Sequence, residues 1–228
     1  MTSSQSREER RPYFPMFLGN GNDSVLLGYA GTMGACGGHE HWLYEQGVIT
    51  GWFKADQRIA GSLANLLQSG YFIRQGLHSI GMNRLLGQRF DPVTGVLHNR
   101  NLHGRIGVDV RSCLAAGPVL LHRFAFQAVA ADCHFQFFIQ ASSCWWLPMR
   151  LPSPAPLLHR VRADGRTGLR FEIRLDGKIY PGRLGIDHPR TRPVTCYNGC
   201  AGLEVPLRYP APLTVQVVLD DPKGGPLR

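Results

Sequence analysis

Residues 169–184, LRFEIRLDGKIYPGRL, decide the fold class of this chain. Apolar side chains take every second position of the first half, with charged ones between them: Leu169, Phe171, Ile173 and Leu175 against Arg170, Glu172 and Arg174. A period of two is typical of a β-strand with one buried face. Asp176-Gly177 then supplies a dipeptide that favours a two-residue hairpin turn, and the chain returns as KIYPGRL. The sequence therefore predicts an antiparallel β-hairpin here.

The same alternation recurs in residues 213–219, where Val218 interrupts the polar face and indicates burial on both sides of the strand. Further strands are expected at residues 24–29, 48–53, 105–111, 119–129, 133–140 and 157–163. Gly, Pro, Asn and Asp residues separate these segments, as turns require. The pattern predicts an all-β protein with little helix, built as an antiparallel meander or β-sandwich.

Two segments depart from this alternation. Residues 61–70, GSLANLLQSG, carry Leu63, Leu66 and Leu67 at helical spacing, so we expect a short surface helix or a turn. Residues 147–159 contain four prolines, which lack the N–H group that a sheet needs, and we expect a connection between strands or an edge crossing.

The length and composition fit one globular domain. The chain has 228 residues, of which 43% are hydrophobic and 18% charged. We expect a single β-sandwich domain over residues 13–220, a disordered tail over 1–12 and a C-terminal tail over 221–228. No apolar run is long enough to span a membrane, and the polar N-terminus lacks the apolar core of a secretory signal. The expected location is the cytoplasm, with no membrane partner.

The net charge of +9 raises the question of nucleic-acid binding. The excess comes from 22 arginines and three lysines that are scattered along the chain. Because binding requires a basic stripe rather than a basic average, we expect no nucleic-acid partner. The six cysteines belong to a chain that is neither small nor visibly secreted, so reduced thiols are expected.

The glycine-rich segment at residues 19–23, GNGND, has two possible interpretations. A phosphate-binding loop needs a helix N-terminus after it, together with a Lys-Ser/Thr pair or G-x-G-x-x-G spacing. Here the strand-like run SVLLGYAG follows instead. Asn-Gly and Asn-Asp tolerate the positive φ angles of tight turns, so a β-hairpin is predicted and no nucleotide cofactor is expected.

His39-Glu40-His41 and Cys36 are residue types that bind Zn²⁺. In an extended segment both imidazoles would point to one side, but the local sequence supplies no third ligand. We therefore assign no metal and expect a surface or substrate-facing segment. Cys196 and Cys200 lack the two-residue spacing and second pair of a zinc ribbon, and buried structural thiols are expected.

Residues 39–58, HEHWLYEQGVITGWFKADQR, combine acids with aromatic residues. Paired carboxylates can cleave glycosidic bonds, and flat rings stack on sugars. The candidate acids are Glu40, Glu45 and Asp56. The aromatic residues, which include Trp42 and Trp52, can equally be core residues of successive strands.

Three phrases together resemble a known domain: FLGNGNDSVLLGYAG at 17–31, GQRFDPVTGVLHNR at 87–100, and the alternating run at 105–130. They are similar to the N-terminal β-supersandwich domain of inverting (α/α)6-barrel glycoside hydrolases and phosphorylases, the maltose, trehalose and kojibiose phosphorylase group. The resemblance implies a galactose-mutarotase-like supersandwich. It rests on turns and alternation over most of the chain.

In that group the general acid lies on the helical barrel that follows the sandwich, so no catalytic residue can be carried over to this chain. The resemblance implies a non-catalytic domain, with a helical-barrel domain or subunit and carbohydrate as partners. A truncated or split-gene product would fit this expectation. His39, Glu40, His41 and Trp42 are the candidate substrate-binding residues, because a loop of the sandwich can approach the barrel's active-site mouth in the group.

Two other functions remain open at this stage. The chain could be a small enzyme acting on sugars through Glu40, Glu45 and Asp56. It could also be an all-β module that binds a metal or a protein partner.

Overall fold

The computed structural model describes residues 16–20, 23–27, 49–54, 58–59, 62–63, 66–76, 78–79, 83–130, 132–141, 157–196, 200–208 and 212–223. Within these ranges the protein is all-β and contains no helix, which confirms the predicted fold class. The described part therefore has no helix that could cross a membrane. Its strands are β1 (Met16–Gly19), β2 (Asp23–Leu27), β3 (Ile49–Lys54), β4 (Arg58–Ile59), β5 (Ser62–Leu63), β6 (Leu67–Gln75), β7 (His78–Ser79), β8 (Asn83–Asp91), β9 (Val96–His103), β10 (Ile106–Leu114), β11 (Val119–Gln127), β12 (Cys133–Ala141), β13 (Leu157–Asp164), β14 (Gly168–Leu175), β15 (Lys178–Ile186), β16 (Arg192–Thr195), β17 (Ala201–Pro206) and β18 (Leu213–Leu219).

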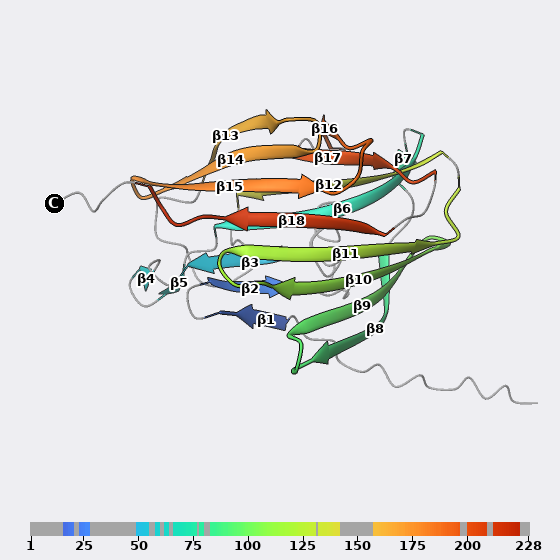
Figure 1. Cartoon of the computed structure of the whole chain (residues 1–228), viewed down its shortest axis with the longest axis horizontal. Helices are drawn as coiled ribbons and strands as arrows, with labels where there is room; N and C mark the ends of the chain where they lie inside the picture. The colour runs from blue at the N-terminus through green and yellow to red at the C-terminus, as the bar shows by residue number, and fades with distance from the viewer. Residues whose placement is uncertain are drawn as a thin grey trace, which may run out of the picture.

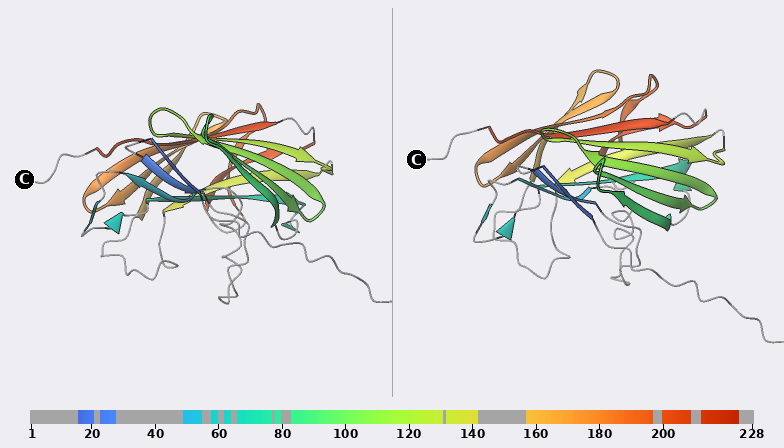
Figure 2. Two further views of the ribbon diagram at one scale, coloured as in Figure 1. Left: turned by 90° about the horizontal axis from the view of Figure 1, so that it is seen from below. Right: turned by 60° about the horizontal axis from the view of Figure 1, so that its bottom comes forward.

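The strands form an antiparallel sandwich (Figures 1 and 2). An eight-stranded sheet has the order β13-β14-β15-β18-β11-β10-β9-β8, and a five-stranded sheet has the order β16-β17-β12-β6-β7. The three-stranded sheet β1-β2-β3 continues the second layer, because the Leu66 amide just before β6 donates to the Trp52 carbonyl of β3 over 2.8 Å. Strands β4 and β5 pair only with each other.

The hairpin predicted at residues 169–184 is confirmed as β14 and β15. Leu175 pairs with Lys178 across the two-residue turn. Asp176 and Gly177 have φ angles of 48° and 73°, the positive values of the hairpin turn that this dipeptide favours. The inner face carries Leu169, Phe171, Ile173 and Leu175, all buried, as the alternation predicts.

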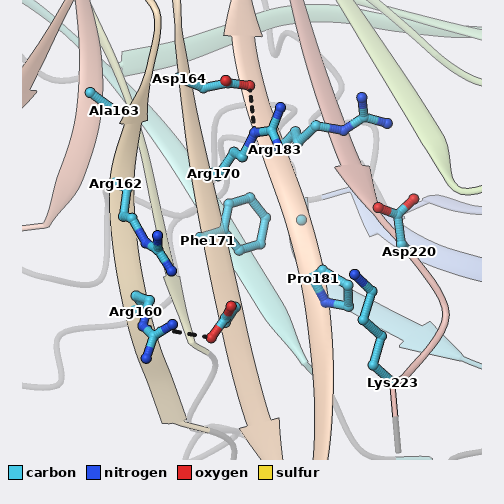
Figure 3. A pocket seen from close by; sticks show the side chains of 12 residues that line it. Arg160, Arg162, Ala163, Asp164, Arg170, Phe171, Pro181, Arg183, Asp220 and Lys223 are labelled. Carbon is cyan, nitrogen blue, oxygen red and sulfur yellow. Dashed lines mark ion pairs between the residues drawn. The ribbon is translucent and has the colours of Figure 1, made fainter.

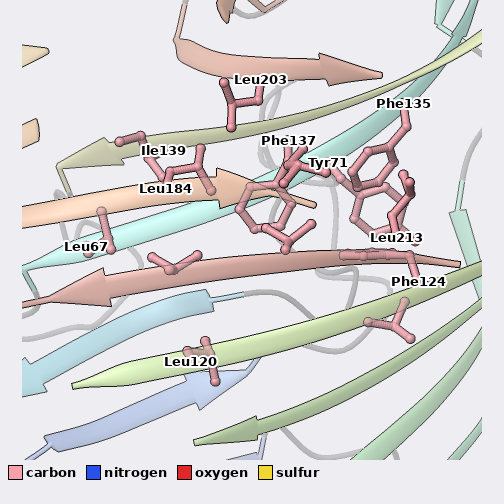
Figure 4. Packing of buried hydrophobic residues seen from close by; sticks show 14 of the residues in the cluster. Leu67, Tyr71, Leu120, Phe124, Phe135, Phe137, Ile139, Leu184, Leu203 and Leu213 are labelled. Atoms are coloured by element: carbon pink, nitrogen blue, oxygen red, sulfur yellow. The ribbon is translucent and has the colours of Figure 1, made fainter. Parts of the chain in front are cut away.

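The core lies between the two layers and is rich in aromatic rings (Figure 4). Phe124 of β11 packs against Phe135 of β12 with ring centroids 4.8 Å apart, and against Tyr71 of β6 at 5.1 Å. These rings come from both sheets, so they join the two layers directly.

The last strand occupies a central place in the larger sheet. β18 pairs with β11 on one side and with β15 on the other, and it thereby joins the β13–β15 unit to the β8–β11 meander. Val218, which interrupts the polar face of this strand, is only 3% exposed, so the predicted burial on both sides is confirmed.

The hairpin predicted around the GNGND turn is also confirmed. β1 and β2 pair antiparallel, and the side-chain oxygen of Asn20 accepts a hydrogen bond from the Asp23 amide over 2.9 Å. The Asn20 side chain also donates to the Gly117 carbonyl over 2.8 Å, which ties this turn to the loop between β10 and β11.

The short surface helix expected at residues 61–70 is wrong for the described part of this segment. Ser62 and Leu63 form β5, residues 67–70 begin β6, and Leu66 lies just before β6. Leu66 and Leu67 are fully buried, and β6 pairs along its whole length with β12. Leucines at helical spacing can equally lie in a buried strand, and pairing with β12 decided in favour of the strand.

Candidate functional site

The residues that the sequence singled out for substrate binding, His39, Glu40, His41 and Trp42, lie outside the described residues. The same holds for Glu45, Asp56 and Cys36. Of the aromatic residues in that segment, Trp52 is fully buried, and its indole N–H donates to Asp23 over 2.9 Å. Trp52 is therefore a core residue, as the alternative interpretation held, and it is not a surface for sugar stacking.

The most distinctive feature of the described structure is a line of basic side chains across the outer face of the eight-stranded sheet. The register sets residues of neighbouring strands directly opposite one another, from β8 to β11, in the order Arg89, His98, Arg111 and Arg123. Thr214 of β18 continues the line. We call the four residues Arg89, His98, Arg111 and Arg123 the first basic row.

The three arginines of the first basic row form no ion pair among the described residues. No carboxylate there lies within ion-pair distance of Arg89, Arg111 or Arg123. Like charges on directly opposite residues destabilise a sheet by about 0.2–1 kcal/mol per pair. Arg111 and Arg123, which stand directly opposite each other, therefore carry an electrostatic cost that no described ion pair offsets.

The nearest acids on this face are already engaged. The Asp109 carboxylate lies 3.2 Å from His98 Nε2, which makes His98 the one member of the row within ion-pair distance of an acid among the described residues. Asp91 accepts hydrogen bonds from the Thr94 hydroxyl (2.7 Å) and from the Val93 amide (3.0 Å), and these bonds lower the pKa of its carboxyl group. The positive charge of Arg89 also acts on Asp91 and helps to lower the pKa of that carboxyl group.

The first basic row lines a shallow hollow of about 610 Å³, which we call the first hollow. This volume lies within the range of roughly 300–1,000 Å³ that is usual for small-molecule sites. The rest of the lining includes one carboxylate, Asp91, together with Thr94, Val96, Ser112, Cys113, Leu121, His122 and Thr214. Guanidinium groups bind carboxylates, sulfates and phosphates through paired N–H groups, so this arrangement suits an anionic ligand.

A second arrangement of interest is a serine–histidine pair in the interior. The Ser112 hydroxyl lies 2.7 Å from His122 Nδ1, and the two residues are 1% and 0% exposed. Burial lowers the pKa of His122 to about 3. A general base works best with a pKa near the working pH, so this buried and weakly basic imidazole is poorly suited to activate the serine.

Another interior group pairs a phenol with an amide. Tyr71 and Asn101 are 0% and 1% exposed. Burial raises the pKa of the Tyr71 phenol far above its usual range, and the Asn101 side chain opposes this only in part. These groups stay neutral at physiological pH and can only form hydrogen bonds.

The buried carboxylates of Glu204 and Asp23 form ion pairs. Glu204 is 1% exposed and accepts hydrogen bonds from Gln136 (2.7 Å) and Arg192 Nε (3.0 Å), with Arg74 Nε at 3.1 Å. Burial works to raise its pKa, but these hydrogen bonds and charges outweigh burial and lower the pKa. Asp23 and Lys54 form a second buried pair, 2.6 Å apart, in which both side chains are 1% exposed. The lowered pKa of Glu204 makes it unsuited to act as a general acid.

The described cysteines are free thiols, as predicted. Cys196 is buried, and burial raises its pKa to about 12, so it behaves as the structural thiol that was expected. Cys200 is only half-buried, so the burial expected for it is wrong, and its thiol donates to the side-chain oxygen of Gln140 over 3.2 Å. No group of three or more His, Cys, Asp or Glu residues in the described ranges is arranged to hold a metal ion.

No family model matches this sequence, and no curated protein is significantly similar to it. The functional proposal therefore rests on the chemistry of the outer sheet face and on the resemblance in the sequence.

Sequence reasoning missed Arg89, Arg111 and Arg123 as a group. Alternation within each strand can predict that such an arginine faces outward. It cannot predict that three arginines, separated by up to 34 positions, stand at one level of the sheet, because only the pairing register sets that level.

Proposed function

We propose that this protein is a non-catalytic, carbohydrate-binding β-sandwich domain of the kind found in glycoside hydrolases and phosphorylases, and that its ligand is an anionic saccharide. The observation that carries the proposal is the first basic row, in which Arg111 and Arg123 stand directly opposite each other and none of the three arginines forms an ion pair among the described residues. A bound carboxylate, sulfate or phosphate group would offset the repulsion within the row.

The chemistry of the described interior supports a binding role over a catalytic one. Glycoside cleavage by a general acid needs a carboxyl group that can carry a proton near the working pH. Glu204 has a lowered pKa and is held by Arg74 and Arg192, while Asp23 is held by Lys54. A helical-barrel domain, in the same chain or as a separate subunit, is the partner that the sequence resemblance favours for the chemical step.

An anionic ligand is favoured over a neutral sugar. Neutral sugars are usually held by flat aromatic rings that stack on their apolar faces. The outward positions of the described strands of the larger sheet carry no Phe, Tyr or Trp. For the same reason single-stranded nucleic acid is not favoured, since its bases stack on aromatic side chains.

Binding of digalacturonate tests this proposal, with its fully methyl-esterified form as the uncharged counterpart. Isothermal titration calorimetry should show binding of the acid and at least about tenfold weaker binding of the ester. Arg111→Gln combined with Arg123→Gln should weaken binding of the acid by at least about tenfold.

The matched control combines Arg105→Gln with Arg190→Gln, which removes the same charge from two exposed arginines away from the row. It should change the affinity less than about twofold. Equal binding of the acid and the ester, or equal effects of the two double variants, would contradict the proposal. Preferential binding of a single-stranded RNA would replace it with a different function.

A further inference from the structure

A second hollow lies on the other half of the eight-stranded sheet (Figure 3). Its volume is about 460 Å³, and β13, β14, β15 and the segment after β18 line it. Five cationic side chains face three acidic ones in this lining: Arg160, Arg162, Arg170, Arg183 and Lys223 against Asp164, Glu172 and Asp220.

The arginines of this hollow also form a line across the strands. Arg162, Arg170 and Arg183 stand directly opposite one another on β13, β14 and β15, and we call them the second basic row. Arg170 Nε lies 3.0 Å from Asp164. Arg162 and Arg183 have no carboxylate within ion-pair distance among the described residues.

Lys223 is fixed beside the second basic row by its backbone. Its amide donates to the Ile179 carbonyl over 2.7 Å, and its carbonyl accepts from the Ile179 amide over 3.4 Å. This bridge holds the segment after β18 against β15, and it places the Lys223 ammonium at the side of the hollow opposite Arg160 (Figure 3).

The two rows share one face of one sheet. Arg123 stands opposite Thr214, and Arg183 stands opposite Val218. Thr214 and Val218 are four positions apart on β18, and residues an even number of positions apart point to the same side of a strand. With about 4.8 Å between strands and about 3.4 Å per residue, the backbones of Arg123 and Arg183 are separated by about 17 Å.

The surface between the rows carries no opposing charge on the two strands that cross it. Leu121 of β11 and Gln216 of β18 stand opposite each other, two residues along from Arg123 and Thr214, and the next outward position of β18 is the buried Val218. An extended chain that leaves the first hollow can therefore reach the second without passing an acidic side chain of these strands.

We propose that the two basic rows bind successive anionic groups of one linear polymer, an anionic polysaccharide, so that the outer sheet face is a continuous binding track with two ends. This inference rests on the proposed function and specifies it further, because a small anionic sugar would need only one hollow. Once a polymer is bound at one row, its next anionic groups are held at a high effective concentration near the other row. A ligand that reaches both rows therefore binds more tightly without any new kind of contact.

Oligogalacturonates of two lengths test the track. Digalacturonate is too short to bridge the rows, whereas decagalacturonate is long enough. The native protein should bind the decamer at least about a hundredfold more tightly than the dimer. The second-row variant, Arg162→Gln combined with Arg183→Gln, should lose most of that gain and should bind the dimer within about threefold of the native protein, since the first hollow is intact.

The first-row variant, Arg111→Gln combined with Arg123→Gln, separates this inference from the proposed function. If it weakens dimer binding while the second-row variant leaves decamer binding unchanged, the track is refuted and the proposed function stands. If neither variant weakens the binding of either ligand, both the track and the proposed function are refuted. Lys223 lies outside the named strands, so Lys223→Gln changes the second hollow without changing a residue of the sheet. This variant should also reduce the affinity for the decamer.

Discussion

Arg111 of β10 and Arg123 of β11 stand directly opposite each other on the outer face of the larger sheet, and both are exposed. Opposed like charges of this kind destabilise a sheet. Binding sites often carry such a cost, because charges placed for a ligand repel one another in its absence.

Arg111→Gln should therefore stabilise the free protein by about 0.2–1 kcal/mol at low ionic strength. The gain should shrink in 1 M salt, where the screening length falls to about 3 Å. Urea denaturation at low salt and in 1 M salt measures this change in the free energy of unfolding. Arg105→Gln is the control for loss of one exposed positive charge. A destabilised Arg111→Gln variant would show that the arginine has a structural role.

A glycine on β15 gives a test of the packing beneath the second hollow. A Cβ at Gly182 would collide with the Phe171 ring and would lie 2.8 Å from the Val218 carbonyl oxygen. Gly182→Ala should cost roughly 1–3 kcal/mol, because the buried ring and a sheet backbone cannot both give way.

Gly185 on the same strand is the matched control, since a Cβ there meets only the Thr167 carbonyl oxygen at 3.9 Å. Gly185→Ala should change the free energy of unfolding by less than about 0.5 kcal/mol. Thermal unfolding of the two variants distinguishes them. Adding Phe171→Leu to Gly182→Ala should restore part of the loss, and equal stability of the two alanine variants would contradict the predicted packing.

His122 should make the protein sensitive to mild acid. The folded protein keeps this imidazole neutral down to a pH of about 3, whereas the unfolded chain protonates it near pH 6.5. The unfolded chain therefore binds more protons between these values, and stability falls as the pH drops through this range. The total loss is on the order of 4 kcal/mol.

His122→Gln removes this titration and leaves a polar group for Ser112. Urea denaturation at pH 7.5, 6 and 5 should show a shallower loss of stability in this variant than in the native protein. The same substitution at the exposed His159 serves as the control. Parallel pH profiles for the native protein and His122→Gln would show that the imidazole is accessible to protons in the folded state.

Protonation of Glu204 should cause a separate loss of stability at lower pH. Its lowered pKa means that its stabilising effect is complete above the ordinary glutamate pKa of about 4.3 and disappears as the pH falls through the folded-state value. Glu204→Gln should cost roughly 1–3 kcal/mol at pH 7, since charge-assisted hydrogen bonds to Arg192 are lost. Its denaturation profile below pH 4.3 should be flatter than that of the native protein.

Glu172, which is only half-buried, provides a comparison for Glu204. Its oxygen lies 3.9 Å from Arg160, and both side chains are partly open to solvent. Exposed ion pairs of this kind contribute about 0–1 kcal/mol. Glu172→Gln should therefore have a much smaller effect at pH 7, and equal losses in the two variants would contradict the assigned role of Glu204.

The sequence by itself determined the elements whose signals are local. Alternation predicted the strands from β10 to β14 and β18, Asp176-Gly177 predicted the turn that joins β14 to β15, and GNGND predicted the β1–β2 hairpin. These predictions succeeded because side-chain period and turn geometry depend on residues a few positions apart.

Only the tertiary structure decided what depends on distant partners. Pairing with β12 made residues 67–75 a strand, although the leucines of residues 61–70 suggested a short helix that would overlap its start. The insertion of β18 between β15 and β11 brought the two basic rows onto one sheet face. The candidate residues His39, Glu40, His41 and Trp42 stay a prediction. Strand order and register are set by contacts across the whole chain, and therefore the alignment of Arg89, Arg111 and Arg123 has no signature in the sequence around any one of them.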